Sequence, residues 1–89
     1  MIDISNRKNI NIKDKKITVI GLGMSGTAAA ILANYLGARV FGSDSSENFQ
    51  ITNHASSLLK SHISSETGLH SNRIFDADLW IVSPGIPND

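Results

Sequence analysis

Cysteine is absent from the sequence, so a disulfide framework and a thiolate metal site are both excluded. An excess of charge of one sign is also lacking, because eight Lys and Arg balance eight Asp and Glu. No overall field therefore draws the chain to nucleic acid or to an acidic membrane, and any anion site must be local. The longest apolar run, residues 28–33, is too short to cross a bilayer, and the N-terminus lacks the apolar core of a signal peptide. These absences predict a cytoplasmic protein with neither a membrane nor a nucleic-acid partner.

Length and composition indicate one small globular domain. The chain has 89 residues, too few for two domains, and 40% of them are hydrophobic, with Ile, Leu, Val and Ala dominating over aromatic residues. This composition is typical of an α/β domain rather than of a disordered segment. Residues 1–15 are polar and show no sustained periodicity, so we expect a polar N-terminal arm there and a folded domain over residues 16–89.

Short apolar runs and helical patterns alternate along that domain. Residues 16–20 and 79–82 are continuous runs typical of buried parallel strands, and residues 39–43 form another short strand. A helix is expected from Ser25 to just before Gly37, with an apolar stripe made of Ala28, Ile31, Leu32, Tyr35 and Leu36. Strand, helix and strand together predict a right-handed βαβ unit.

The second half of the chain continues the alternation. Residues 53–62 predict another helix, capped by Thr52 or Asn53, and residues 63–66 and 73–77 predict a short strand and a helical turn. The fold class is therefore α/β, a three-layer, Rossmann-like open parallel sheet with helices on both faces. Such a sheet usually continues beyond this point, so we expect the domain to be truncated at its C-terminal end.

A glycine-rich segment, GLGMSG at residues 21–26, connects the first strand to the first helix; we call it the glycine turn. Its first glycine permits the tight turn, Gly23 lets a diphosphate approach the backbone, and Gly26 permits close packing of helix on strand. The N–H groups of Met24, Ser25 and Gly26 would then point at the ligand, reinforced by the helix dipole. Glycines also end strands for structural reasons alone, but the strand-to-helix context favours a phosphate cradle.

Two further segments point to the same edge of the sheet. Asp44 stands at the tip of the next strand, where a dinucleotide-binding domain keeps the acid that contacts ribose, although an aspartate that merely starts a turn fits as well. Ser45 beside it offers a hydroxyl and an N–H. The loop after residue 82 contains Ser83 and Gly85, which could face the same ligand if the first and last strands are neighbours.

In combination, residues 20–26, 42–44 and 77–87 resemble the N-terminal domain of the Mur ligases, which build the peptide stem of bacterial peptidoglycan. The resemblance is nearest to the D-glutamate-adding branch, which often shows a G-L-G-x-[ST]-G turn and an S-P-G-[IV] loop. The turn also echoes the L-alanine-adding sister, which prefers an extra glycine and lacks the Ser-Pro-Gly loop. The similarity covers about residues 16–87.

The resemblance implies a domain that binds the UDP moiety of UDP-MurNAc-L-alanine. By position, Met24, Ser25 and Gly26 would contact the diphosphate, supported by Ser83 and Gly85, while Asp44 and Ser45 would contact the uracil. The candidate substrate-binding residues are therefore Gly23, Met24, Ser25, Gly26, Asp44, Ser45, Ser83 and Gly85. The family would also supply ATP and Mg²⁺ to the full-length enzyme, and the remaining ligase domains would be this domain's partners.

Catalytic machinery is not visible in the sequence. No lysine follows any of the seven glycines with the spacing of GxxxxGK[ST], so the chain lacks the ATP-binding loop that the ligase reaction requires. The three histidines are spaced eight apart, which does not suit a metal site, and no nucleophile elbow is present. We therefore predict no catalytic residue, no metal site and no cofactor in this chain. The alternatives are an NAD-binding half-domain of a dehydrogenase or regulatory module, and a scaffold that binds no nucleotide.

Overall fold

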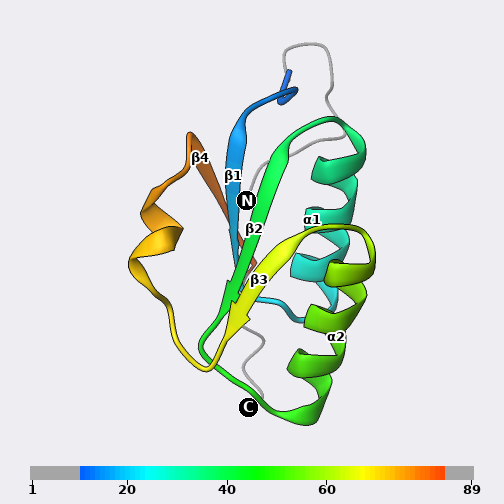
Figure 1. Cartoon of the computed structure of the whole chain (residues 1–89), viewed down its shortest axis with the longest axis vertical. Helices are drawn as coiled ribbons and strands as arrows, with labels where there is room; N and C mark the ends of the chain where they lie inside the picture. Colours follow the sequence, from blue (N-terminus) through cyan, green and yellow to red (C-terminus); the bar gives the residue numbers. More distant parts are fainter. Residues whose placement is uncertain (1–10, 84–89) are drawn as a thin grey trace.

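A parallel sheet of four strands organises residues 11–83, the part of the chain that the computed structural model describes (Figure 1). The strands are β1 (Lys16–Ile20), β2 (Arg39–Asp44), β3 (Ser64–Thr67) and β4 (Leu79–Val82), in the order β3-β2-β1-β4. β1 pairs in parallel with both β2 and β4, so its carboxyl end lies between theirs. The predicted Rossmann-like α/β class is confirmed.

Both α-helices lie on one face of the sheet, which differs from the expected placement on both faces (Figure 1). They are α1 (Met24–Tyr35) and α2 (Phe49–Lys60), and within residues 11–83 the only helix on the other face is the 3₁₀ helix η2 (Asn72–Phe75). The strand order explains the difference. The steps from β1 to β2 and from β2 to β3 run in one direction, and right-handed crossovers then place both helices on the same face. Only the return from β3 to β4 crosses the opposite face, which we call the second face.

Small residues bring α1 close to the sheet. Its buried positions are Gly26, Thr27, Ala30 and Ala33. Most of the predicted apolar stripe is wrong: Tyr35 is 84% exposed, and Ile31 and Leu32 are 41% exposed each, whereas Leu36 does pack against the core. A helix lined with Gly and Ala approaches a sheet more closely than one lined with Leu or Tyr. The face of α1 that packs on the sheet is therefore marked by the spacing of its small residues and not by that of its large hydrophobic residues.

The helix α2 begins four residues earlier than predicted. Its N-cap is Asn48, whose side-chain oxygen accepts a hydrogen bond of 2.9 Å from the Ile51 N–H, and not Thr52 or Asn53. Ile51 and Leu58 face the core, together with Leu22 from the glycine turn and Ile63 after the helix. The apolar face of α2 therefore packs against the connection between β1 and α1.

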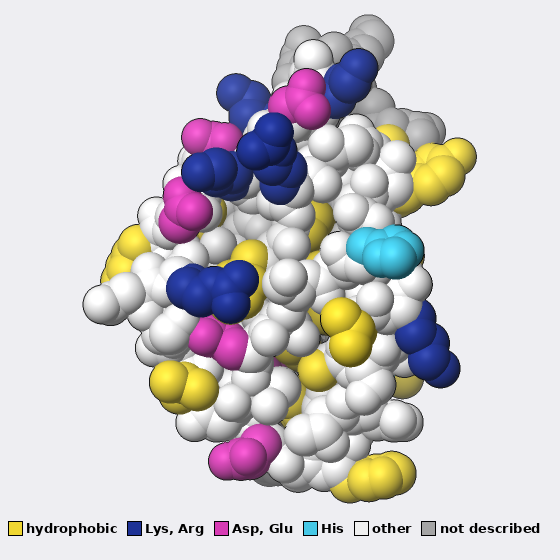
Figure 2. All heavy atoms as spheres, viewed as in Figure 1, with side chains coloured by type: hydrophobic (Ala, Val, Ile, Leu, Met, Phe, Trp, Pro, Cys, Tyr) yellow, Lys and Arg dark blue, Asp and Glu magenta, His cyan; other side chains and the backbone are white. Residues whose placement is uncertain are grey.

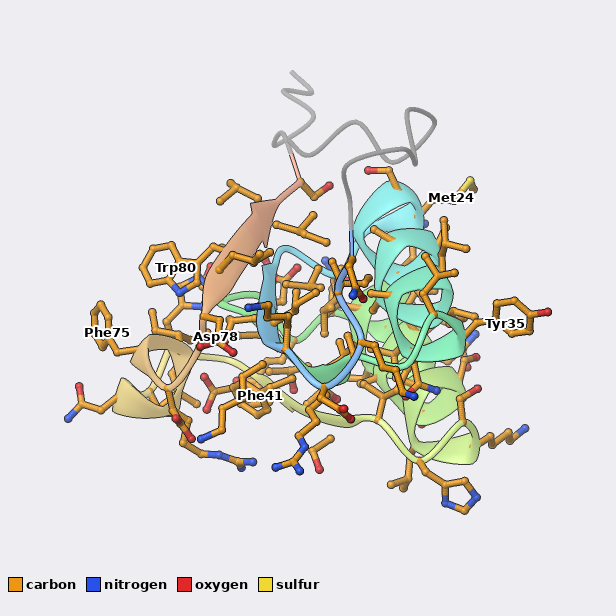
Figure 3. The ribbon with its side chains drawn as sticks, turned by 90° about the horizontal axis from the view of Figure 1, so that it is seen from above. Met24, Tyr35, Phe41, Phe75, Asp78 and Trp80 are labelled. Carbon is orange, nitrogen blue, oxygen red and sulfur yellow. The ribbon has the colours of Figure 1, made fainter. Side chains whose placement is uncertain are left out.

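The second face is only thinly covered. Trp80 is 42% exposed, although its place in an apolar strand predicts a core residue. Its indole N–H donates to the Ile74 carbonyl at 2.8 Å, and its ring lies 5.7 Å from that of Phe75 (Figure 3). Alternate residues of the edge strand β4 point to the two faces, so Leu79 and Ile81 pack under the helices while Trp80 lies on the second face beside η2.

The end of the predicted N-terminal arm contacts the core. Ile12 is 7% exposed and belongs to the buried cluster, and the Asp14 N–H donates to the Gly37 carbonyl at 2.9 Å. Within residues 11–83, no helix combines the length and apolar character needed to cross a membrane.

Candidate functional site

The glycine turn, Asp44 and Ser83 meet at the carboxyl edge of the sheet, as predicted from their positions after strands. β1 lies between β2 and β4, so the turn after β1 is flanked by the ends of both neighbours. The strand order reverses at this place, because chain-consecutive β2 and β3 lie on one side of β1 and β4 lies on the other. A crevice at such a reversal is the usual ligand site of an open parallel sheet.

Each glycine of the turn has a different surrounding. Gly21 has a φ of 97°, which L-residues rarely adopt. A Cβ on Gly26 would overlap the Gly21 carbonyl, so only glycine permits this helix-to-turn contact. A Cβ on Gly23 would meet nothing within 4 Å, so this residue faces open space. The first and third glycines thus build the turn, while the second leaves room in front of it.

The N–H groups at the start of α1 are available to a ligand. The N-cap, Gly23, makes no side-chain capping bond, and its carbonyl accepts the first intrahelical hydrogen bond from the Thr27 N–H at 2.9 Å. Among residues 11–83, the N–H groups of Met24, Ser25 and Gly26 have no partner. The Met24 side chain is 78% exposed and points away from the protein (Figure 3). Such a helix start favours an anion through its free donors and its dipole.

Asp44 binds the chain's own backbone. One carboxylate oxygen accepts the Leu22 N–H at 2.7 Å and the other accepts the Ser46 N–H at 2.8 Å. The aspartate therefore closes a turn over residues 44–46, and it also ties the end of β2 to the glycine turn; its contact with a ligand stays a prediction. Ser45 is exposed at the tip of that turn. Each carboxylate oxygen keeps a second lone pair for a further donor.

The predicted approach of the loop after β4 to the glycine turn is present at Ser83. Its N–H donates to the Ile20 carbonyl at 2.9 Å, and its hydroxyl lies 2.8 Å from that of Ser25. The two serines therefore connect the beginning of α1 to the end of β4. Gly85, the other residue predicted in that loop, lies outside the described residues.

Positive side chains gather elsewhere. Figure 2 shows Lys and Arg concentrated at the upper end of the molecule, where Figure 1 places the start of β1, and Lys16 and Arg39 are the first residues of β1 and β2. Among residues 11–83, neither the glycine turn nor residues 45–48 contain a Lys or an Arg. An anion at the carboxyl edge would therefore be held mainly by backbone N–H groups and hydroxyls.

A second polar cluster lies on the second face. The hydroxyl of Ser43, which is fully buried, donates to a Glu66 carboxylate oxygen at 2.7 Å and lies 2.7 Å from His70 Nδ1. The same Glu66 oxygen accepts the Ser71 N–H at 2.8 Å. Burial acts to raise the pKa of Glu66, but the hydrogen bonds from Ser71 and Ser43 and the charge of Arg73 outweigh it, and they hold the pKa of this carboxyl below its ordinary value.

That cluster is structural in character. A fully buried serine hydroxyl cannot reach a substrate, and Glu66 contacts the serine rather than the histidine, so the order of a nucleophilic triad is not present. The cluster joins β2 and β3 to the segment that leads into η2. Within residues 11–83, no group of three or more His, Asp and Glu side chains is placed to hold a metal ion.

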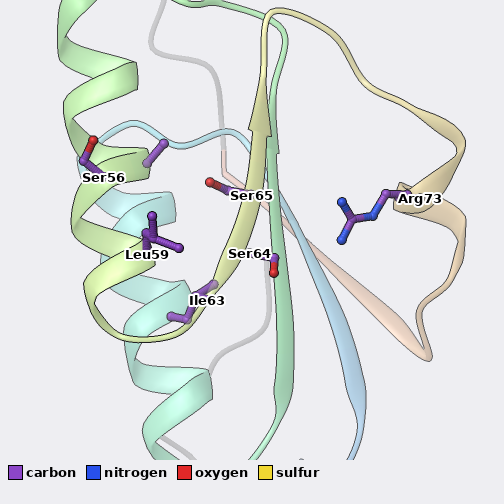
Figure 4. A pocket seen from close by; sticks show the side chains of 7 residues that line it. Ser56, Leu59, Ile63, Ser64, Ser65 and Arg73 are labelled. Carbon is purple, nitrogen blue, oxygen red and sulfur yellow. The ribbon is translucent and has the colours of Figure 1, made fainter.

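A hollow of about 360 Å³ lies along the free edge of β3, away from the glycine turn (Figure 4). Ala55, Ser56 and Leu59 of α2 line it on one side, and Arg73 lies beyond the strand on the other. None of the predicted site residues contributes to it. The Arg73 guanidinium is already engaged, since it lies 4.2 Å from the centre of the Phe41 ring.

Two residues that form hydrogen bonds to the buried side of the glycine turn were not predicted from the sequence. Thr27 Oγ1 and His54 Nδ1 both donate to the Leu22 carbonyl, at 3.0 and 2.7 Å. Thr27 directly follows the glycine turn and its hydroxyl was a recognisable candidate donor. His54 comes from α2, and no pattern in the sequence indicates a contact across 32 residues.

Comparison with known proteins adds to this geometry. The family described as "MurD N-terminal domain" matches residues 16–89. UDP-N-acetylmuramoylalanine–D-glutamate ligase of Koribacter versatilis is 41% identical over 81 residues, covering 90% of this chain and 18% of that protein. The enzyme of the same name from Bacteroides thetaiotaomicron is 46% identical over 77 residues, covering 84% and 17%. The chain thus spans less than a fifth of the length of these relatives.

Among solved structures, the A chain of dipicolinate synthase from Bacillus subtilis superposes with a TM-score of 0.68 at 18% identity, covering 90% of this chain and 26% of that one. At this identity the likeness concerns the fold alone.

Proposed function

Because the chain belongs to the MurD N-terminal domain family, we propose that it binds the UDP moiety of UDP-MurNAc-L-alanine within a D-glutamate-adding ligase. The domain would hold the substrate while other parts of the full-length protein perform the chemistry. The observation that carries the proposal is the start of α1, where Gly23 faces open space in front of three N–H groups without partners among the described residues.

The electrostatics of this helix start favour a diphosphate. Two or more N–H groups directed at one anionic group give charge-assisted hydrogen bonds, and the helix dipole adds a favourable field in the first turn. The hydroxyls of Ser25 and Ser83, 2.8 Å apart, can supply a further donor at the same edge. Gly85 would contribute its N–H from the loop that follows. Backbone N–H groups and serine hydroxyls would thus bind the diphosphate without a long charged side chain.

Asp44 and Ser45 would recognise the base. Uracil presents one N–H donor between two carbonyl acceptors, so a carboxylate lone pair together with a neighbouring N–H or hydroxyl complements that edge. Asp44 is already fixed by the N–H groups of Leu22 and Ser46, so the carboxylate is oriented before the ligand arrives. Its remaining lone pairs would meet the uracil with little reorganisation.

The reaction itself belongs to the longer protein. In the D-glutamate-adding ligases, ATP phosphorylates the substrate carboxylate and the amine of D-glutamate then attacks the acyl phosphate. This chain contains no GxxxxGK[ST] segment, and the ATP and Mg²⁺ that the full-length enzyme needs would be bound elsewhere. The chain's own residues would bind and orient the UDP end of the substrate. By itself the 89-residue chain would not catalyse ligation.

Ligand-observed NMR or calorimetry with three ligands tests the proposal. UDP and UDP-MurNAc-L-alanine should bind in competition with each other, and NADH should not displace them. Preference for NADH would refute the proposal, because an NAD-binding half-domain would then be the better description.

A further inference from the structure

Leu22, in the middle of the glycine turn, is held by three hydrogen bonds, two of them to the carbonyl of its peptide bond with Gly23. The Leu22 N–H donates to Asp44, and the Leu22 carbonyl accepts from both Thr27 Oγ1 and His54 Nδ1. Leu22 itself is fully buried. Three hydrogen bonds on one residue therefore fix the middle of the glycine turn.

One consequence follows from the planarity of the peptide group. The chain contains no cis peptide bond among the described residues, so the Leu22 C=O and the Gly23 N–H lie in one plane and point in opposite directions. The carbonyl points inward, to His54 and Thr27. The Gly23 N–H must then point the opposite way, away from His54 and Thr27, and it has no hydrogen-bond partner among residues 11–83.

The peptide plane between Leu22 and Gly23 needs these hydrogen bonds because glycine residues flank Leu22. Gly21 and Gly23 flank Leu22, and glycine backbones rotate more freely than those of other residues. Without donors on the Leu22 carbonyl, the plane could turn and direct an oxygen, which repels phosphate, toward the ligand space. Of the two donors, Thr27 lies in the adjacent helix and moves with it, whereas His54 comes from α2, the helix that follows the Asp44 turn.

We propose that His54 is a positioning residue for the diphosphate: its Nδ1–H donor on the Leu22 carbonyl keeps the Gly23 N–H directed at the ligand and couples α2 to the glycine turn. This inference rests on the proposed UDP binding. A carbonyl oxygen can only accept, so the proton must be on Nδ1, and Nε2 is left without one in the neutral ring.

Variants at position 54 separate this role from general packing. His54→Asn keeps an N–H donor close to the position of Nδ1, whereas His54→Leu keeps bulk but has no donor. Asn53→Leu is the matched control, since it introduces the same residue one position away on the exposed side of α2. The dissociation constant for UDP and the midpoint of thermal unfolding are measured for each variant and for the parent chain.

The expected result is a loss of UDP affinity of about three- to tenfold in His54→Leu, which corresponds to one hydrogen bond. His54→Asn should recover most of that loss, and Asn53→Leu should bind as the parent does. The ¹⁵N spectrum of the His54 ring should show the proton on Nδ1. A loss in His54→Leu that His54→Asn does not recover would overturn the inference, as would a proton found on Nε2 alone.

The outcomes also separate the two proposals. If the parent binds UDP and His54→Leu binds equally well, only the role of His54 is refuted. If the parent binds neither UDP nor UDP-MurNAc-L-alanine, the proposed function is refuted and the role of His54 is refuted with it.

Discussion

Replacing Gly23 with valine separates ligand binding from folding at the glycine turn. The backbone at this position is extended, with φ −69° and ψ −169°, a conformation that valine adopts without strain. A Cβ would meet nothing within 4 Å, so the added side chain would not clash with the protein. It would instead occupy the space in front of the N–H groups of Met24, Ser25 and Gly26. The substitution should therefore block the ligand while leaving the fold in place.

The size of the effect follows from the donors that are blocked. Losing two charge-assisted hydrogen bonds to a diphosphate costs at least about 3 kcal/mol, or roughly a hundredfold in Kd. Valine is a poorer N-cap than glycine, and Gly23 makes no side-chain capping bond, so the free energy of unfolding should fall by no more than about 1 kcal/mol.

Calorimetric titration with UDP and thermal unfolding measure these two quantities on the same samples. Gly23→Ala is the graded comparison, because a single methyl group fills less of the space and should weaken binding less than valine. If Gly23→Val bound UDP as tightly as the parent chain does, the open space at Gly23 could not be the diphosphate site and the reasoning would be wrong.

Three other substitutions test separate parts of the structure. Gly26→Ala should destabilise the fold by about 3 kcal/mol or more in chemical denaturation, since its Cβ would overlap the Gly21 carbonyl, and an unchanged midpoint would contradict that packing. Asp44→Ala should weaken UDP binding by about 1 to 3 kcal/mol through lost charge-assisted hydrogen bonds, and equal affinity would remove Asp44 from the site. Glu66→Gln tests whether the lowered pKa of Glu66 makes the stability of the fold depend on pH. The folded pKa of Glu66 lies below its ordinary value of 4.5, so its contribution to stability is present above about pH 4.5 and lost as the pH falls through the folded pKa. The parent should therefore be more stable than Glu66→Gln at pH 7, and the difference should shrink in acid; a difference that is the same at pH 7 and pH 3 would be the contrary result.

Local signals in the sequence predict the strands and the glycine turn well. β1 begins at Lys16 and ends at Ile20 as predicted, because continuous apolar residues followed by Gly21 leave few alternatives. Ser83 can approach the glycine turn only if β1 and β4 are adjacent strands, and their pairing confirms that they are. The family resemblance carried by the same segments is confirmed by the match over residues 16–89.

Features that depend on packing between elements were not predictable in the same way. The burial of Ala30 and Ala33 instead of Ile31 and Leu32 results from how closely α1 approaches the sheet, which a hydrophobic pattern does not encode. The contact of His54 with the Leu22 carbonyl depends on the placement of α2. The predicted start of this helix was itself four residues later than its actual start at Phe49. The roles of the candidate substrate-binding residues stay predictions, to be tested as described.

The single tryptophan has a practical consequence for solution studies. Trp80 packs against Phe75 and donates to the Ile74 carbonyl on the second face, on the opposite side of the sheet from α1. Its emission should therefore follow the attachment of the 3₁₀ segment to the sheet and change little when the helix start is filled. Fluorescence can thus monitor unfolding of this chain at saturating nucleotide, giving a stability signal that is independent of the binding signal.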